Sequence, residues 1–251
     1  IFGIVAPHAG YVYSGPVAGY AYKLIKGKKY ETVVVISPSH QEFFRGCSVF
    51  DGDAYETPLG QIKVDKETAK SIANKVENIY LSSKGHHIKG MGEHSLEVQL
   101  PFLQVALGKF EVVPIVIGDQ SEENCSALGM VLAEALKDKN ALIVASSDLS
   151  HYHSYDEARK IDSRAVDCFE KGDLKGILDC EACGSGPIYA MLSASQRLGA
   201  TKTKILKYAT SGDVPIGEKG RVVGYMSGIA YEEDKKKSGS EVGFDLTPEE
   251  K

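Results

Sequence analysis

Residues 32–40 have the sequence TVVVISPSH. The first five are all β-branched, without the polar alternation of a strand that has one face in water. Such a run predicts a strand at Thr32–Ser37 that is buried on both faces, as strands in a parallel sheet are. Similar runs predict three more strands, at Ile1–Ala6, Glu111–Ile117 and Ala141–Ser146.

Segments with the helical spacing of apolar residues lie between and after these strands. The alternation of strands and helices implies βαβ crossovers, which place helices on the faces of a parallel sheet. The predicted fold class is therefore α/β: a single domain with a mostly parallel central sheet flanked by helices on both faces. The predicted helices are Ser14–Lys26, Asp65–Lys75, His94–Leu107, Ser121–Lys137, Tyr155–Lys171 and Gly184–Leu198; further strands are predicted at Lys204–Thr210 and Val222–Tyr231, and a small β excursion at 47–64.

The composition bounds the class of protein. The 251 residues include 29 Lys and Arg against 34 Asp and Glu, and the formal charge of −5 argues against nucleic-acid binding by bulk charge. No apolar run approaches the roughly 18 residues that cross a bilayer, and the first residues lack the basic region of a signal peptide. We expect a cytoplasmic protein with no nucleic-acid and no membrane partner. We expect one domain over residues 1–231, whose N-terminus is truncated, and a polar linker or tail at 232–251.

The five cysteines are odd in number and mostly far apart, so the sequence predicts reduced thiols rather than a disulfide framework. Cys180 and Cys183 have the C-x-x-C spacing that is typical of redox motifs and of half zinc sites. A lone pair of this kind also arises by chance. Redox chemistry and coincidence both stay open as interpretations.

Histidines follow several predicted strands at the point where each strand ends. His8 follows the first strand and His40 the second, and Asp148 and His151 follow the strand at 141–146. Ligands bind beyond the carboxyl ends of strands in open parallel sheets, because loops from several strands converge there. Two imidazoles on separate strands are able to hold a divalent ion, so the pattern favours a metal site over isolated loop caps. Asp148 is expected either to act with His151 in proton transfer or to cap a helix that follows it.

Two further site candidates lie at predicted helix starts. His94 would share a helix face with Glu97, which is then able to orient its imidazole, although an acidic first turn also satisfies the helix dipole. Cys183 precedes two glycines in the sequence CGSGP, and a helix N-terminus there would stabilise its thiolate, the form that binds metals. A role as a small buried apolar residue is the alternative for Cys183.

The remaining histidines are expected to have no part in the site. His86 and His87 lie in a loop rich in glycine and lysine, which predicts that both are exposed to solvent, and His153 is given the same interpretation. The substitution His86→Ala is therefore expected to have little effect.

Six motifs, taken in order, resemble the Memo (mediator of cell motility) family. The resemblance spans residue 1 to about residue 231. It implies a fold similar to that of the class III extradiol ring-cleaving dioxygenases, which use a non-haem iron. The chain is similar to protein B of the AmmeMemoRadiSam system, which implies AMMECR-type and radical-SAM partner proteins. The motifs are APHAGYVYSGPVAGYAY, ISPSH, GEHSLEVQLPF, SSDLSHY, CGSGPI and VVGYMSGIAY.

The resemblance also implies roles for individual residues. It places His8, His40 and Cys183 in a metal-binding pocket, with iron or copper as the preferred ion and zinc as an alternative. The third iron ligand of the dioxygenases is a carboxylate, whereas the matching position here is a cysteine, and Glu181 is a second candidate for that ligand. The catalytic residues that would line the same cleft are Asp148, His151 and His94.

Three functional hypotheses follow from these residues. The first is a redox-active metalloprotein with non-haem iron or copper in a dioxygenase-like cleft, acting on a small-molecule or peptide ligand. The second is a non-catalytic module that binds a peptide or phosphopeptide on the same scaffold. The third is a zinc-dependent hydrolase, because zinc binds imidazole and thiolate together and keeps a position for water.

Overall fold

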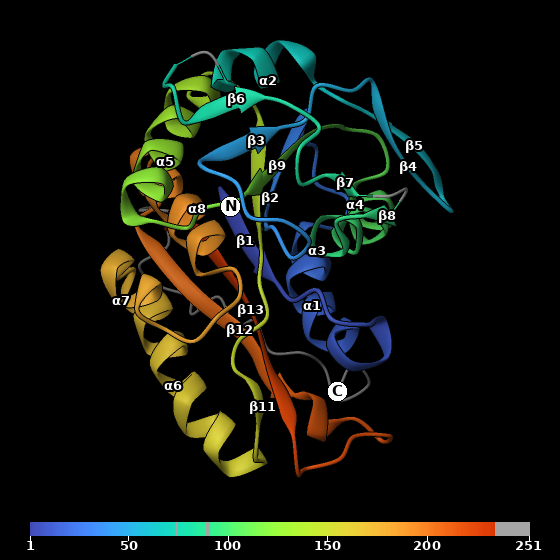
Figure 1. The fold of residues 1–251 in the computed structure, drawn as a ribbon, viewed down its shortest axis with the longest axis vertical. Helices are drawn as coiled ribbons and strands as arrows, with labels where there is room; N and C mark the ends of the chain where they lie inside the picture. The colour runs from blue at the N-terminus through green and yellow to red at the C-terminus, as the bar shows by residue number, and fades with distance from the viewer. Residues whose placement is uncertain (74, 89–90, 234–251) are drawn as a thin grey trace.

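A nine-stranded sheet runs through the middle of the molecule (Figure 1). The structure is a computed structural model, and it describes residues 1–73, 75–88 and 91–233. Its centre consists of four parallel strands in the order β1-β10-β2-β9. All four carry β-branched or apolar runs, and almost every residue in them is buried. These strands are β1 (Gly3–Ala6), β10 (Ala141–Ser146), β2 (Thr32–Pro38) and β9 (Glu111–Ile117).

Antiparallel strands complete the sheet at both edges. On one side β13 pairs antiparallel with β1, β11 and β12, and on the other β3 pairs antiparallel with β9 and parallel with β6. Two short hairpins, β4–β5 and β7–β8, lie outside this sheet. The bounds are β3 (Cys47–Val49), β4 (Ala54–Thr57), β5 (Gly60–Lys63), β6 (Ile79–Leu81), β7 (His87–Ile88), β8 (Met91–Gly92), β11 (His151–His153), β12 (Lys202–Thr210) and β13 (Val222–Tyr231).

Helices cover both faces of the sheet. In Figure 1 α1, α3 and α4 lie on one side of it, and α5, α6, α7 and α8 lie on the other. The predicted fold class is therefore confirmed. No described helix has the length and apolar content needed to cross a membrane. The helices are α1 (Tyr11–Ile25), α2 (Lys66–Ala73), α3 (His94–Glu97), α4 (Gln99–Leu107), α5 (Glu122–Leu136), α6 (Tyr155–Lys171), α7 (Leu174–Leu178) and α8 (Ser185–Arg197), with a 3₁₀ turn at Ser211–Asp213.

The helix predicted at 94–107 is two helices rather than one. Pro101 has no backbone N–H, so it cannot donate to the carbonyl of Glu97 as a continuous α-helix requires. The chain divides at Val98, and Pro101 occupies the first turn of α4, where a missing N–H costs little. The tail expected at 232–251 lies outside the described residues from position 234 onward.

Parallel pairing brings the carboxyl ends of three central strands to the same edge of the sheet. Ser146 at the end of β10 pairs with Ala6 at the end of β1, and Ala145 pairs with Ile36 near the end of β2. The loops that follow these strands therefore begin side by side. This edge carries the candidate site.

Candidate metal centre

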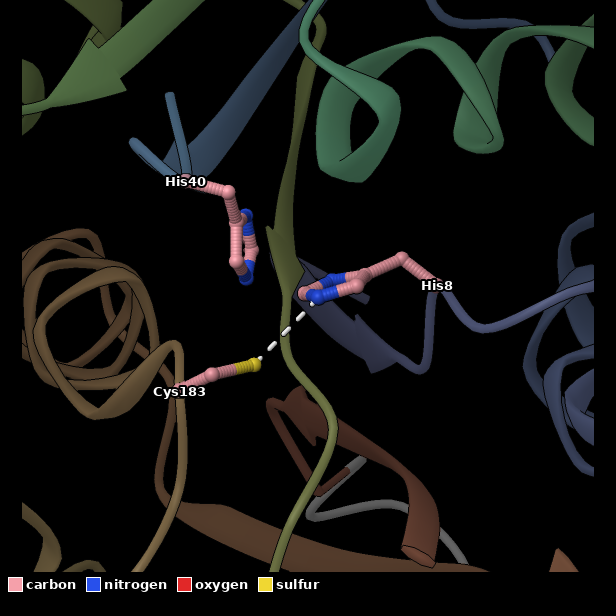
Figure 2. Close-up of side chains that lie close together, drawn as sticks. All are labelled: His8, His40 and Cys183. Atoms are coloured by element: carbon pink, nitrogen blue, oxygen red, sulfur yellow. Dashed lines mark hydrogen bonds between the residues drawn. The ribbon is translucent and has the colours of Figure 1, made fainter. Parts of the chain in front are cut away.

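Three side chains from distant parts of the sequence point toward one another at this edge (Figure 2). His8 follows β1, His40 follows β2, and Cys183 lies just before α8. One ligand atom from each lies within 4.8 Å of the other two. The Sγ atom of Cys183 is 3.3 Å from Nε2 of His8, and the ring centroids of His8 and His40 are 5.2 Å apart. The structure thus brings together the three residues for which a shared metal was predicted.

The backbone around Cys183 and His8 is held by the loop after β10. The backbone N–H groups of His8 and Ala9 donate to Oδ1 of Asp148 at 2.8 and 3.3 Å. The N–H of Cys183 in turn donates to the carbonyl oxygen of Asp148 at 3.3 Å. Gly184 permits this approach, because a methyl group there would collide with the carbonyl oxygen of Ser146. Asp148 therefore joins the segments that carry two of the three candidate ligands.

The hydrogen bond at Nδ1 of His8 fixes which ring nitrogen faces the cluster. Ser146 donates its single hydroxyl hydrogen to the carbonyl oxygen of Ser95, which is only an acceptor. The hydroxyl oxygen must therefore accept from Nδ1 of His8, which lies 2.9 Å away. Nε2 then carries the lone pair of the ring, and it faces the sulfur of Cys183.

Glu93 has the same orienting role for His40. Glu93 is 1% exposed, and its Oε1 accepts a hydrogen bond from Nδ1 of His40 at 3.0 Å. Glu93 also accepts from the backbone N–H of His40 and from Ser95. Burial raises the pKa of Glu93, but the hydrogen bonds from His40 and Ser95 outweigh it and leave the pKa below its usual value. The ionised carboxylate therefore keeps the hydrogen on Nδ1 and leaves the lone pair of Nε2 available.

The protonation states suit ligands that bind a cation. Burial, and then the nearby imidazoles of His40, His94 and His151, hold the pKa of His8 well below its usual value, so that ring is neutral at neutral pH. Burial and then Asp148 raise the pKa of Cys183 to about 12, so a cation that binds its sulfur displaces a proton. Asp148 itself has its pKa raised by burial to about 6.

The donor set fits a transition metal. Two neutral imidazoles and a thiolate suit iron, copper or zinc, whereas magnesium and calcium prefer oxygen ligands. Metal bonds of about 2.0–2.3 Å to nitrogen and sulfur allow ligand atoms to be a few ångströms apart, as His8, His40 and Cys183 are. Three protein ligands also leave coordination positions for a substrate or water.

Comparison with known proteins shows the family of the chain. The family model described as "Memo-like protein" matches residues 1–229. The chain belongs to the Memo-like family. A MEMO1 family protein of Nitrosopumilus maritimus is 39% identical over 90% of this chain and 82% of the relative, and one of Methanosarcina mazei is 40% identical over 90% and 85%. The family resemblance predicted from the six motifs is therefore confirmed.

A solved structure shows the same fold. The crystal structure of an uncharacterized protein, JW3007, of Escherichia coli K12 superposes with a TM-score of 0.61 over 91% of this chain and 99% of that one. The two chains are 17% identical, so the likeness concerns the fold alone. It agrees with the α/β architecture predicted for this Memo-like chain.

His94 lies beside the three candidate ligands. Its ring centroid is 4.5 Å from that of His40 and 5.6 Å from that of His8, and about half of its side chain is exposed. The acid at its Nδ1 is Glu93, at 3.3 Å, rather than the Glu97 expected from helical spacing. His40, Glu93 and His94 form a second group with metal-ligand spacing, but hydrogen bonds from His40 and Ser95 already occupy the carboxylate of Glu93.

Asp148 does not cap a helix, because the chain enters β11 after it. One of its oxygens binds the N–H groups of His8 and Ala9, and the other lies 4.0 Å from Nε2 of His8. Burial lowers the pKa of His151, a hydrogen bond to the carbonyl of Leu149 opposes this shift, and the nearby imidazole of His40 lowers the pKa further. Both residues therefore lie close to the cluster formed by His8, His40 and Cys183.

The structure gives Glu181 a different partner from the one expected. Its Oε1 accepts hydrogen bonds from Nε2 of His153 at 2.8 Å and from the backbone N–H of His151 at 3.2 Å. Among the described residues it belongs to no group with metal-ligand spacing. The interpretation of Glu181 as a third ligand is therefore wrong for this conformation, and His153 is a paired, half-buried residue rather than a freely exposed one.

The sequence did not predict the residues that orient the imidazoles. Glu93 and Ser146 have common polar side chains, and no spacing in the sequence joins either to the histidine it contacts. Gln99 was missed too; its Nε2 donates to Ser146 and to the carbonyl of Pro7. One clue to Glu93 was available, because it directly precedes a helix and its side chain caps that helix through the N–H of Ser95.

His86 is buried, contrary to the prediction that it is exposed, whereas His87 is exposed as predicted. The Nε2–H of His86 donates to the carbonyl of Ser48 at 3.1 Å, so Nδ1 accepts from the hydroxyl of Tyr55 at 2.7 Å. The carbonyl of His86 accepts from the N–H of Glu93 at 3.0 Å. His86 therefore supports the segment that orients His40, and His86→Ala is expected to destabilise the protein.

The buried imidazole of His86 predicts a loss of stability in acid. Burial lowers its pKa to about 4, against about 6.5 in the unfolded chain. Above pH 6.5 neither state is protonated, whereas below it the unfolded state gains a proton that the folded state excludes until about pH 4. The free energy of unfolding should therefore fall by about 2 kcal/mol from this group between pH 7 and pH 5.

Urea unfolding of the wild type, His86→Gln and His87→Gln at these two pH values measures the contribution of His86 to the free energy of unfolding. The difference between the two pH values should shrink by that amount in His86→Gln and stay unchanged in His87→Gln. Equal pH dependence in all three proteins would contradict the prediction.

Proposed function

We propose that this Memo-like protein holds one redox-active transition-metal ion, iron or copper, between His8, His40 and Cys183, and acts on a small-molecule or peptide ligand there. One observation carries the proposal: each imidazole is fixed at Nδ1 by a separate hydrogen bond, so that the remaining nitrogen of each is left to face the cysteine sulfur. Histidines that only cap loops do not need this paired orientation.

A redox metal at this position would supply electron exchange with dioxygen or with a bound substrate. The protein's own residues would position the ion and move protons. Asp148, whose pKa burial raises to about 6, is able to give and take a proton near neutral pH at the oxygen that faces His8. His94 is half exposed beside the same cluster, so it is placed to pass protons between the cluster and solvent.

The proposal is tested by metal analysis of protein purified without chelators and without a metal-affinity step. We expect close to one equivalent of iron or copper per chain, together with oxygen consumption when a reductant is supplied. Zinc alone at the same stoichiometry would overturn the redox part of the proposal. No bound metal after reconstitution with each of the three ions would overturn the whole of it.

Cys183→Ser tests the contribution of the sulfur. Copper(II) or iron(III) bound by a thiolate absorbs visible light through sulfur-to-metal charge transfer, and a serine hydroxyl gives no such band. We expect the band to disappear in Cys183→Ser and the dissociation constant to rise at least tenfold, because a hydroxyl is a poor substitute for a soft thiolate.

Cys180→Ser is the matched control, since it removes the other thiol of the same C-x-x-C motif. It should keep both the band and the affinity. An unchanged spectrum in Cys183→Ser would show that the sulfur is not a ligand.

A further inference from the structure

The two cysteines of the C-x-x-C motif do not face each other as a pair in the folded chain. Cys183 points toward His8 and His40, as Figure 2 shows. The thiol of Cys180 instead donates to the carbonyl oxygen of Gly176 at 3.0 Å and lies near enough to the thiol of Cys168 to interact with it. The thiol partner of Cys180 therefore comes from α6 and not from the motif.

The turn between α6 and α7 creates this contact. Cys168 lies in the last turn of α6, and its carbonyl accepts from the N–H of Asp173 at 2.9 Å. Gly176 in α7 lies beside both sulfurs: a methyl group there would be 2.6 Å from Sγ of Cys168, and its carbonyl oxygen accepts from the thiol of Cys180. The absence of a side chain at Gly176 therefore lets the two thiols approach each other around its backbone.

The two thiols differ in their access to solvent. Cys180 lines a surface cavity of about 500 Å³, together with Lys160, Arg164 and Glu181. Cys168 is 7% exposed and packs in the hydrophobic core. A small reagent that enters the cavity would therefore reach Cys180 first, and Cys168 lies in position to react second.

We propose that Cys168 and Cys180 form a reversible dithiol–disulfide site, separate from the metal-binding group, whose oxidant is a small disulfide such as glutathione disulfide. This layout has an accessible thiol and a buried thiol in contact with it, so that a mixed disulfide at the first is resolved by the second. The proposal does not depend on the proposed metal, because neither cysteine belongs to the group formed by His8, His40 and Cys183.

The exchange takes place in two steps. The thiolate of Cys180 attacks one sulfur of the small disulfide; a mixed disulfide forms, the small S–S bond breaks, and the first small thiol leaves with the proton that Cys180 lost. The thiolate of Cys168 then attacks Sγ of Cys180, and the second small thiol leaves with the proton that Cys168 lost. Two electrons pass from the protein to the small disulfide.

The disulfide would join the end of α6 to the segment that leads into Cys183. It would close a loop that contains α7 and restrict the unfolded chain more than the folded one. We therefore expect the midpoint of thermal unfolding to rise by about 5 °C on oxidation and to return after treatment with dithiothreitol.

Peptide mapping by mass spectrometry tests the site directly. Burial and the neighbouring Cys168 raise the pKa of Cys180 to about 12, so the exchange is slow and is run overnight with glutathione disulfide at about pH 8.5. The titratable thiols of the denatured protein should fall from five to three, with a crosslink between the peptides of Cys168 and Cys180.

Variants distinguish the crosslink between Cys168 and Cys180 from chemistry at Cys183 in the metal-binding group. Cys183→Ser should still form the crosslink, and Cys168→Ser should stop at a glutathione adduct on Cys180. A crosslink between Cys180 and Cys183, a lasting glutathione adduct in the wild type, or five remaining thiols would each overturn the proposal. The wild-type map decides the question even if Cys168→Ser does not fold.

Discussion

The double substitution His8→Ala/His40→Ala is expected to reduce bound metal from close to one equivalent to near zero while the chain stays folded. Each imidazole presents one nitrogen to the position where the metal would lie. After both substitutions, Cys183 would be the one candidate ligand left of the three. Loss of an orienting partner typically weakens metal binding about 10–100-fold. Loss of two ligands should exceed that range, so that the ion does not survive gel filtration.

Elemental analysis gives the metal content, and far-UV circular dichroism shows whether the fold is kept. His8 is 2% exposed and bonded to Ser146, so its removal leaves a small buried gap. His40→Ala alone provides a second test, because its side chain is 30% exposed and its removal disturbs packing less. His153→Ala is the matched control, since this histidine pairs with Glu181 outside the group. Equal metal in the control and the double variant would rule out the proposed centre.

Glu93→Gln is expected to weaken metal binding about 10–100-fold without removing any ligand atom. The carboxylate now accepts hydrogen bonds from Nδ1 and the backbone N–H of His40 and from Ser95. An amide of the same shape has one accepting oxygen and one donating nitrogen, so some of these donors lose their acceptor. Where the NH₂ group faces Nδ1 of His40, it favours the tautomer that carries hydrogen on Nε2, and that nitrogen is then unable to bind a metal.

The dissociation constant of the metal, measured by competition with a chromophoric chelator, checks this expectation. Glu97→Gln is the control, because Glu97 is an exposed acid on the same helix and is the partner that helical spacing predicts for His94. The control should bind metal as the wild type does. If the two variants bind metal equally well, Glu93 has only a structural role as the cap of α3.

Most of the fold could be predicted from the sequence because its strands are buried on both faces. The four central strands carry unbroken apolar runs, and the structure places them within two residues of the predicted bounds. The helix at Tyr155–Lys171 and the strand at Val222–Tyr231 have the bounds that periodicity predicted. The break at Val98 was missed, because the apolar spacing continues through it while the hydrogen bonding does not.

The candidate site could be predicted from the sequence only in part. Its histidines could be found because each follows a strand whose end meets other strand ends at the same edge of the sheet. The role of Glu181 was predicted wrongly, because sequence proximity to Cys183 says nothing of the direction in which its carboxylate points. His86 was misplaced for a similar reason: its neighbours in the chain are typical of an exposed loop, yet Tyr55 and Ser48 enclose its ring.

The amino-acid sequence by itself determined the layers of this protein, the edge of the sheet at which polar groups gather, and the family to which it belongs. These follow from local patterns, since burial and periodicity act over a few residues at a time. Only the tertiary structure decided which nitrogen of His8 and of His40 faces Cys183, and which thiol Cys180 meets. A hydrogen bond depends on direction and on distances of a few tenths of an ångström, and residues far apart in sequence meet at that scale only in the folded chain.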